Sequence, residues 1–158
     1  MKITGRKSIS SIIKIFLIIL FIACLIAMIS FPIFTIVYTF LEVCFLYLAA
    51  IPALLMIIEF IKIFNSFEKE KVFDRKIEKR LKMSAIYSFL IGFIFLSNVI
   101  IYSVISIEEF LTEPLKLIYF ILIILMCMIF LILSVGLMIL KNIYKTAVDN
   151  KEENDLTI

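Results

Sequence analysis

Long runs without a charged residue alternate with short charged segments along this chain of 158 residues. A charged side chain inside hydrocarbon is costly, and about 20 apolar residues cross a bilayer as a helix, so each run predicts a membrane-spanning helix. The four runs are residues 15–41, 43–58, 83–107 and 117–140. The predicted spans are 12–31, 39–63, 83–107 and 115–140. The predicted fold class is therefore an all-α polytopic membrane protein with four transmembrane helices.

Local signals refine the ends of these helices. Asp74 is a candidate N-cap, because its carboxylate can accept hydrogen bonds from the free N–H groups of a helix that starts at Arg75. That helix is expected to run into the third span, and Pro114 suits the first turn of the fourth. Residues 65–82 form the predicted inner loop. We divide the chain into a four-helix transmembrane domain, residues 1–148, whose last helix can continue through Tyr144 and Val148, and an acidic tail, residues 149–158.

The basic residues are unevenly distributed between the spans. The arm before the first span, the inner loop and the region after the fourth span carry almost all of the 16 Lys and Arg residues, whereas only Lys116 lies at an outer loop. Because positively charged segments stay cytoplasmic during insertion, this bias predicts that both termini and the inner loop are cytoplasmic. Attraction of the inner loop to anionic lipid headgroups is the simplest further consequence.

The composition argues against most enzyme classes. Hydrophobic residues make up 64% of the chain, it contains no histidine, and its three cysteines lie singly within apolar runs. Zinc sites of the His/Cys type and imidazole-based catalysis are therefore not expected. We predict no enzymatic activity, no cofactor and no metal site. A direct nucleic-acid contact is also not expected, because Glu and Asp interrupt the positive charge of the inner loop.

A few polar and small residues lie within the spans. Ser84, Ser88 and Gly92 recur every four positions and predict a close helix–helix contact, to which Gly136 is a further candidate; a homo-oligomer interface is the alternative. Glu59 precedes Lys62 by three positions, so an interfacial ion pair is favoured over an ion or proton site. Asn98 is expected to form a hydrogen bond between helices in preference to a solute site.

Two stretches resemble one protein family. The loop sequence KVFDRKIEKRLK, residues 71–82, resembles the segment between the second and third spans of the domain-of-unknown-function 2975 family, and the ending ENDLTI is similar to that family's acidic ending. The resemblance implies a small four-span bacterial protein of the cytoplasmic membrane without an established activity. Members are often encoded beside a small helix-turn-helix regulator. The positions that match the two patterns are Phe73, Asp74, Arg80, Leu81, Asn154, Asp155, Leu156, Thr157 and Ile158.

Two functional hypotheses follow from this resemblance and from the charge pattern. In the first, the inner loop and the tail engage a cytosolic partner, such as a helix-turn-helix transcription regulator. Whether the tail docks on that partner or on its own inner loop stays open at this point. In the second, the chain is a small transport or immunity-type protein that acts within the bilayer, and Glu59 and Asn98 are then its candidate polar residues.

Overall fold

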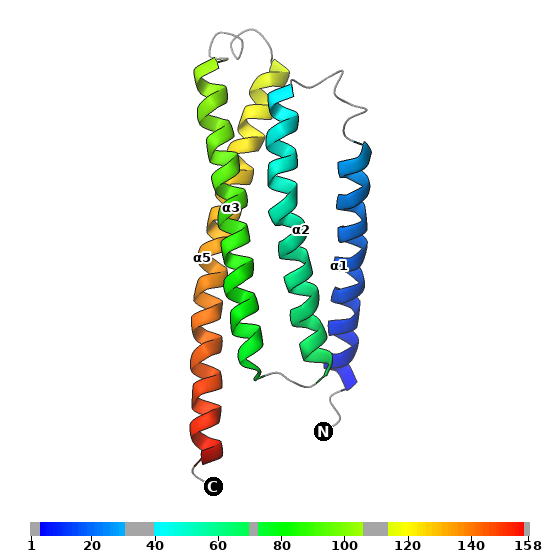
Figure 1. Ribbon diagram of the computed structural model, residues 1–158, viewed down its shortest axis with the longest axis vertical. Coiled ribbons are helices and arrows are strands. Elements are labelled where there is room, and N and C mark those ends of the chain that lie inside the picture. Colours follow the sequence, from blue (N-terminus) through cyan, green and yellow to red (C-terminus); the bar gives the residue numbers. More distant parts are fainter. Residues whose placement is uncertain (1–3, 31–39, 70–72, 106–113, 157–158) are drawn as a thin grey trace.

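The computed structural model describes residues 4–30, 40–69, 73–105 and 114–156, which form four helices (Figure 1). These helices are α1 (Thr4–Ser30), α2 (Phe40–Glu68), α3 (Arg75–Ile105) and α5 (Pro114–Leu156). Each of the four is long and apolar enough to cross a membrane. The predicted all-α fold with four helices of spanning length is therefore confirmed.

The helix boundaries match the local sequence signals. The third helix begins at Arg75, as predicted, and the backbone N–H of Lys76 donates to Oδ1 of Asp74 at 2.9 Å, which identifies Asp74 as the N-cap. The last helix begins at Pro114 and continues past Val148 to Leu156. Two parts of the predicted inner loop, residues 65–68 and 75–82, are helical. The acidic tail is helical as far as Leu156.

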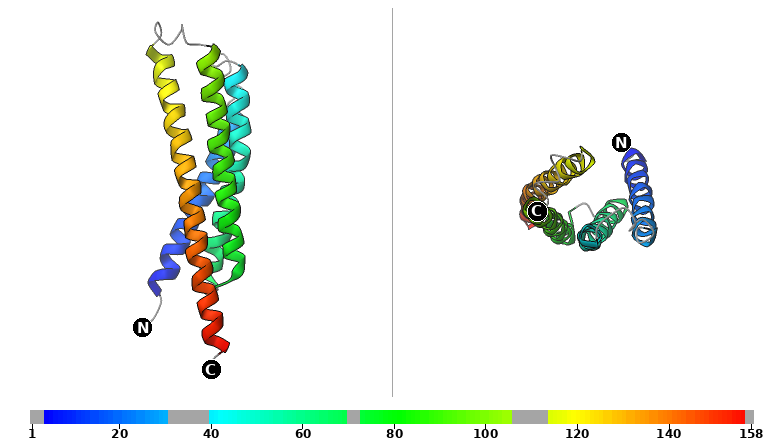
Figure 2. Two further views of the ribbon diagram at one scale, coloured as in Figure 1. Left: turned by 90° about the vertical axis from the view of Figure 1, so that its left-hand side faces the viewer. Right: turned by 90° about the horizontal axis from the view of Figure 1, so that it is seen from above.

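The helices follow one another in an open curve. Extensive contacts join α1 to α2, α2 to α3 and α3 to α5, that is, each helix to the next along the chain. The view along the helices shows α1 and α5 at the two ends of this curve (Figure 2). Because successive helices run antiparallel, the start of α1 and the end of α5 lie at the same end of the molecule, which we call the termini end (Figure 1).

The closest helix contact is between α3 and α5, on the predicted small-residue face. Ser88 Oγ donates to the Phe130 carbonyl at 2.8 Å, and a Cβ added at Gly92 would lie 2.9 Å from Leu131 Cδ2. Ser84 on the same face is fully buried. The predicted contact is thus confirmed for this face. The expectation for Gly136 is wrong, because no described atom lies within 4 Å of an added Cβ there.

A cluster of buried hydrophobic residues lies at the termini end. Ile63 of α2, Leu137 of α5, and Ile77, Leu81 and Ala85 of α3 form one hydrophobic cluster. In contrast, Ser10 is the only buried side chain among those described on α1. The remaining apolar side chains of α1 are exposed or half-exposed, which is compatible with contact between this helix and a lipid bilayer.

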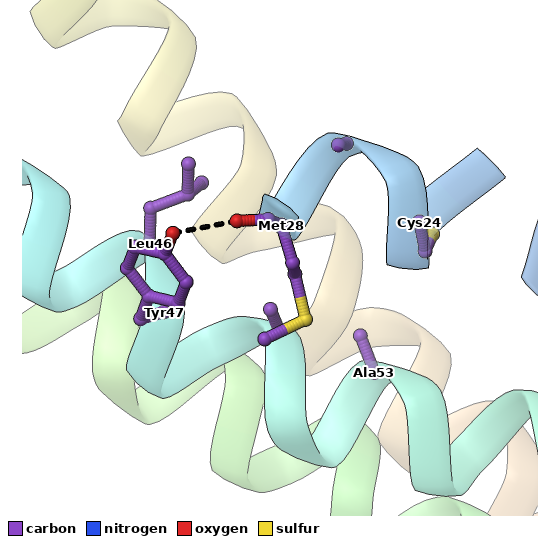
Figure 3. Close-up of a pocket in the computed structure, with 7 residues that line it drawn as sticks. Cys24, Met28, Leu46, Tyr47 and Ala53 are labelled. Atoms are coloured by element: carbon purple, nitrogen blue, oxygen red, sulfur yellow. Dashed lines mark hydrogen bonds between the residues drawn. The ribbon is translucent and has the colours of Figure 1, made fainter. Parts of the chain in front are cut away.

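Two sets of contacts hold α1 against α2. At the termini end, Ser10 Oγ donates to the Phe64 carbonyl at 3.0 Å. Near the opposite end, Tyr47 Oη donates to the Met28 carbonyl at 2.6 Å beside a cavity of about 150 Å³ (Figure 3). Alanine, cysteine, methionine, leucine and tyrosine line this cavity, with no charged residue among them. It is therefore an apolar packing gap between the two helices.

Candidate functional site: the loop–tail junction

The start of α3 contacts the last turns of α5 at the termini end. We call this region the loop–tail junction; its residues are Phe73, Asp74, Arg75, Glu78, Lys141, Tyr144, Asp149, Lys151 and Glu152. Tyr144 lies at the centre of the junction. Its hydroxyl accepts a hydrogen bond from the Asp74 backbone N–H at 3.1 Å. The same hydroxyl can donate to the Asp74 carbonyl, which lies 3.3 Å away. The Tyr144 ring packs against the buried cluster, and burial raises the pKa of its hydroxyl. The N-cap of α3 is thereby tied to α5.

Arg75 forms the outer part of the junction. Its Nε–H donates to Glu152 Oε1 at 3.0 Å and its Nη2 to Oε2 of the same carboxylate at 2.5 Å, while Asp149 Oδ1 lies 3.5 Å from Nη2. The two parallel bonds match the planar fork of the guanidinium. Hydrogen bonding from Arg75 holds the pKa of Glu152 below its ordinary value, and the same bond raises the pKa of Arg75.

Two further contacts involve lysines of α5. Lys141 Nζ lies 3.5 Å from Glu78 Oε1, and both side chains are largely covered. Lys151 Nζ lies 5.1 Å from the centre of the Phe73 ring, a cation–π distance. The Phe73 side chain remains 48% exposed. The junction therefore presents a partly open aromatic ring beside a network of charges.

The length of α5 explains how this helix reaches the inner loop. Its 43 residues extend over roughly 65 Å, whereas the hydrocarbon core of a bilayer is about 30 Å thick. The charge-free part ends at Leu140, and Lys141 begins the polar remainder. The last part of α5 is therefore available to contact the segment that precedes α3.

The predicted partner-binding residues do not all lie in the loop–tail junction. Phe73 and Asp74 are in the junction, and Arg80 lies half-exposed one turn and a half further along α3. Leu81 is only 5% exposed and belongs to the buried cluster, so its side chain is not part of the surface. Asn154 is exposed at the end of α5. The side chains of Asp155 and Leu156, and all of Thr157 and Ile158, lie outside the described residues.

A second polar cluster joins α1 to α2 at the termini end. Glu68 accepts hydrogen bonds from Ser11 at 2.7 Å and from Lys14 at 2.9 Å, and Lys14 Nζ also lies 3.5 Å from Asn65 Oδ1. Glu68 lies beyond the predicted second span, and hydrogen bonding from Lys14 lowers the pKa of its carboxyl. Two of the three pairs of neighbouring helices, α1–α2 and α3–α5, are thus joined by ion pairs at this end.

The two polar residues predicted to lie within the membrane, Glu59 and Asn98, differ in their contacts. Glu59 pairs with Lys62 at 2.6 Å, as favoured from their spacing. Asn98 is 2% exposed, but its side-chain carbonyl has no hydrogen-bond partner among the described residues. The expected hydrogen bond from Asn98 to another helix is therefore wrong for that oxygen.

Sequence reasoning missed the residues of α5 that complete the junction. Tyr144 and Val148 were expected to be helical, but their role was not recognised. Leu137, Lys141, Tyr144 and Val148 repeat at spacings of four, three and four, which is the pattern of one buried helix face. Val148 is 2% exposed. That continued repeat was the signal that α5 keeps packing beyond its charge-free run.

The fold and junction define a small all-α protein whose four helices have membrane-spanning length and whose last helix extends beyond its charge-free part to contact the start of α3. The chain belongs to the family described as protein of unknown function (DUF2975), which it matches over residues 9–158. The expected family membership is thereby confirmed over nearly the whole chain. No curated protein and no solved structure matches the chain.

Proposed function

We propose that this chain is a non-enzymatic, multi-pass protein of the bacterial cytoplasmic membrane, with both termini inside, and that its loop–tail junction receives a cytosolic partner. The partner proposed is a DNA-binding regulator of the helix-turn-helix type. The observation that carries the proposal is the contact of Arg75 with Glu152, which joins the loop to the tail at one end of the molecule. The positive charges at that end support its cytoplasmic placement.

The chemistry of the junction suits a protein partner. Aromatic residues and arginine are enriched in protein–protein interfaces, and Phe73 and Arg75 are both substantially exposed there. The tail is already docked on its own loop. A partner would therefore contact the assembled surface of loop and tail, and not a free peptide.

The alternative of a transport or immunity-type protein has weaker support. A transport site calls for convergent polar groups within the bilayer. The carboxylate of Glu59 is already engaged by Lys62. Loss of ion flux in proteoliposomes on Glu59→Gln would favour this alternative over the proposed one.

The test is co-purification of the detergent-solubilised protein with any small DNA-binding protein that is encoded beside its gene. We expect capture by the full chain, and loss of capture on deletion of residues 152–158 or on Phe73→Ala. Lys82→Gln, which removes an exposed charge of α3 outside the junction, is the matched control. Equal capture by all of these variants would contradict the junction as the partner surface. Reporter fusions at both ends test the orientation independently.

A further inference from the structure

An apolar groove runs between α2 and α3. Its volume is about 320 Å³. Leu48, Ile51, Pro52 and Leu55 line it from α2, and Tyr87, Leu90 and Ile94 line it from α3. No charged residue borders the groove itself, so its occupant must be apolar at this level.

The register of the two helices places basic residues just beyond the groove, towards the termini end. Leu55 and Lys62 are seven residues apart on α2, and Tyr87 and Arg80 are seven residues apart on α3, so each pair lies on one helix face. Ile63 and Leu81, the chain neighbours of Lys62 and Arg80, belong to the same buried cluster. Lys62 and Arg80 therefore lie at the same level, roughly 10 Å past the end of the groove.

The charges at this level are favourable for an anion. Arg80 has no ion-pair partner among the described residues, and neither has Lys76, which lies one turn further along the same face. Lys62 is 48% exposed and paired with Glu59, yet its ammonium retains two further N–H donors. The described carboxylates nearest in sequence to Lys62 and Arg80 are Glu59, which is paired with Lys62, and Glu78, which is paired with Lys141.

We propose that the α2–α3 groove binds one anionic phospholipid of the leaflet at the termini end, with its phosphate between Arg80 and Lys62 and an acyl chain along the groove. An anionic phospholipid has a negative headgroup, which matches the basic level, and an apolar acyl chain, which matches the groove. The spacing fits, because the charged level and the groove together cover roughly 20 Å, comparable to the thickness of one leaflet. The Tyr87 side chain leans towards the start of α3, and thus towards the phosphate.

The test uses the absence of tryptophan from the chain. Tyr87→Trp introduces a single fluorophore at the end of the groove, and quenching by brominated phosphatidylglycerol is compared with quenching by brominated phosphatidylcholine in vesicles. We expect the relative binding constant to favour the anionic lipid about fivefold, the contribution of one basic residue near an anionic surface. Arg80→Gln in this background should bring the ratio close to one.

Two controls distinguish a lipid bound in the groove from a general attraction of anionic lipids to the basic residues of the protein. Lys82→Gln removes the same charge about 200° around the helix from Arg80, and should leave the preference unchanged. Ile132→Trp reports from an exposed position on α5 and should show no preference. Equal losses on Arg80→Gln and Lys82→Gln, or an equal preference at Ile132→Trp, would overturn the site.

The inference rests on the membrane placement in the proposed function, and its failure is separable from that of the placement. A protein that resists alkaline extraction from membranes, but shows no lipid preference at Tyr87→Trp, overturns the lipid site alone. A protein released by alkaline extraction overturns both. If Arg80→Gln fails to fold, Lys76→Gln tests the same charged face, with a smaller expected loss of preference.

Discussion

Arg75 and Glu152 lie 77 residues apart in the sequence and meet through two parallel hydrogen bonds from guanidinium to carboxylate. This contact closes the end of α5 onto the start of α3. Both side chains are at least half exposed, so the contact serves to position the tail more than to stabilise the fold. It is accordingly the first target for mutation.

Reversal of one charge should free the tail. We expect Arg75→Glu to accelerate amide hydrogen exchange in residues 145–156 by about twofold to fivefold, because an exposed ion pair contributes modestly. Glu152→Arg should act similarly. The double variant, which carries both substitutions, should restore slow amide hydrogen exchange. Mass spectrometry of the corresponding peptide measures this. Lys79→Glu, an unpaired exposed position on α3, is the control, and an unrescued double variant would contradict the pairing.

Acid should also release the tail. The docked Glu152 carboxyl has a pKa below its ordinary value of 4.5, so it binds protons less tightly docked than free. Docking is therefore fully stabilised above about pH 4.5 and is lost as the pH falls through the lowered pKa. Fluorescence of Phe73→Trp, recorded from pH 7 to pH 3, should report the transition. A transition with the same midpoint in Glu152→Gln would assign it to another group.

The helices themselves were predictable because their signals are local. Charge-free runs, the Asp74 cap and Pro114 each act within a few residues, and the structure places helices accordingly. The contacts of the loop–tail junction were not predictable in this way. The tail contains several acidic residues that could pair with Arg75. The pairing with Glu152 and Asp149 depends on which face of the α5 helix is turned towards Arg75.

Gly92 and Gly136 illustrate the same limit within the spans. Both are glycines in apolar helices, and the sequence suggested a contact at each. The phase of each helix against its neighbour decided the outcome: Gly92 lies against Leu131, and Gly136 lies on an open face of α5. One glycine is therefore a packing residue and the other is not.

This difference between the glycines can be measured. Gly92→Leu should destabilise the α3–α5 contact by about 1–3 kcal/mol, because the backbone of Leu131 lies 3.3 Å from the added Cβ and cannot give way as a side chain does. Gly136→Leu should be neutral or slightly stabilising, since leucine favours a helix. Thermal unfolding in one detergent compares the two. Equal losses would contradict the close approach at Gly92.

Tyr144 should contribute through its hydroxyl and its ring separately. Tyr144→Phe removes the partner of the Asp74 backbone and should cost about 1 kcal/mol. Tyr144→Ala also removes the ring from the buried cluster and should cost about 3 kcal/mol. Thermal unfolding of both variants against the unchanged protein provides the comparison. If Tyr144→Phe costs as much as Tyr144→Ala, the ring contact is not the larger contribution.

Asn98 provides a decisive test within the apolar part of the helices. Its buried side-chain carbonyl has no hydrogen-bond partner among the described residues, and an unsatisfied buried polar group costs about 1–3 kcal/mol. Asn98→Leu has a similar shape and removes that cost, so we expect stabilisation by about 1 kcal/mol in thermal unfolding. If Asn98 instead binds a solute or a second copy of the chain, the same substitution should destabilise the protein or abolish that association. Size-exclusion chromatography in detergent beside the unfolding measurement separates these results, and destabilisation with loss of a dimer would assign Asn98 to an interface between copies.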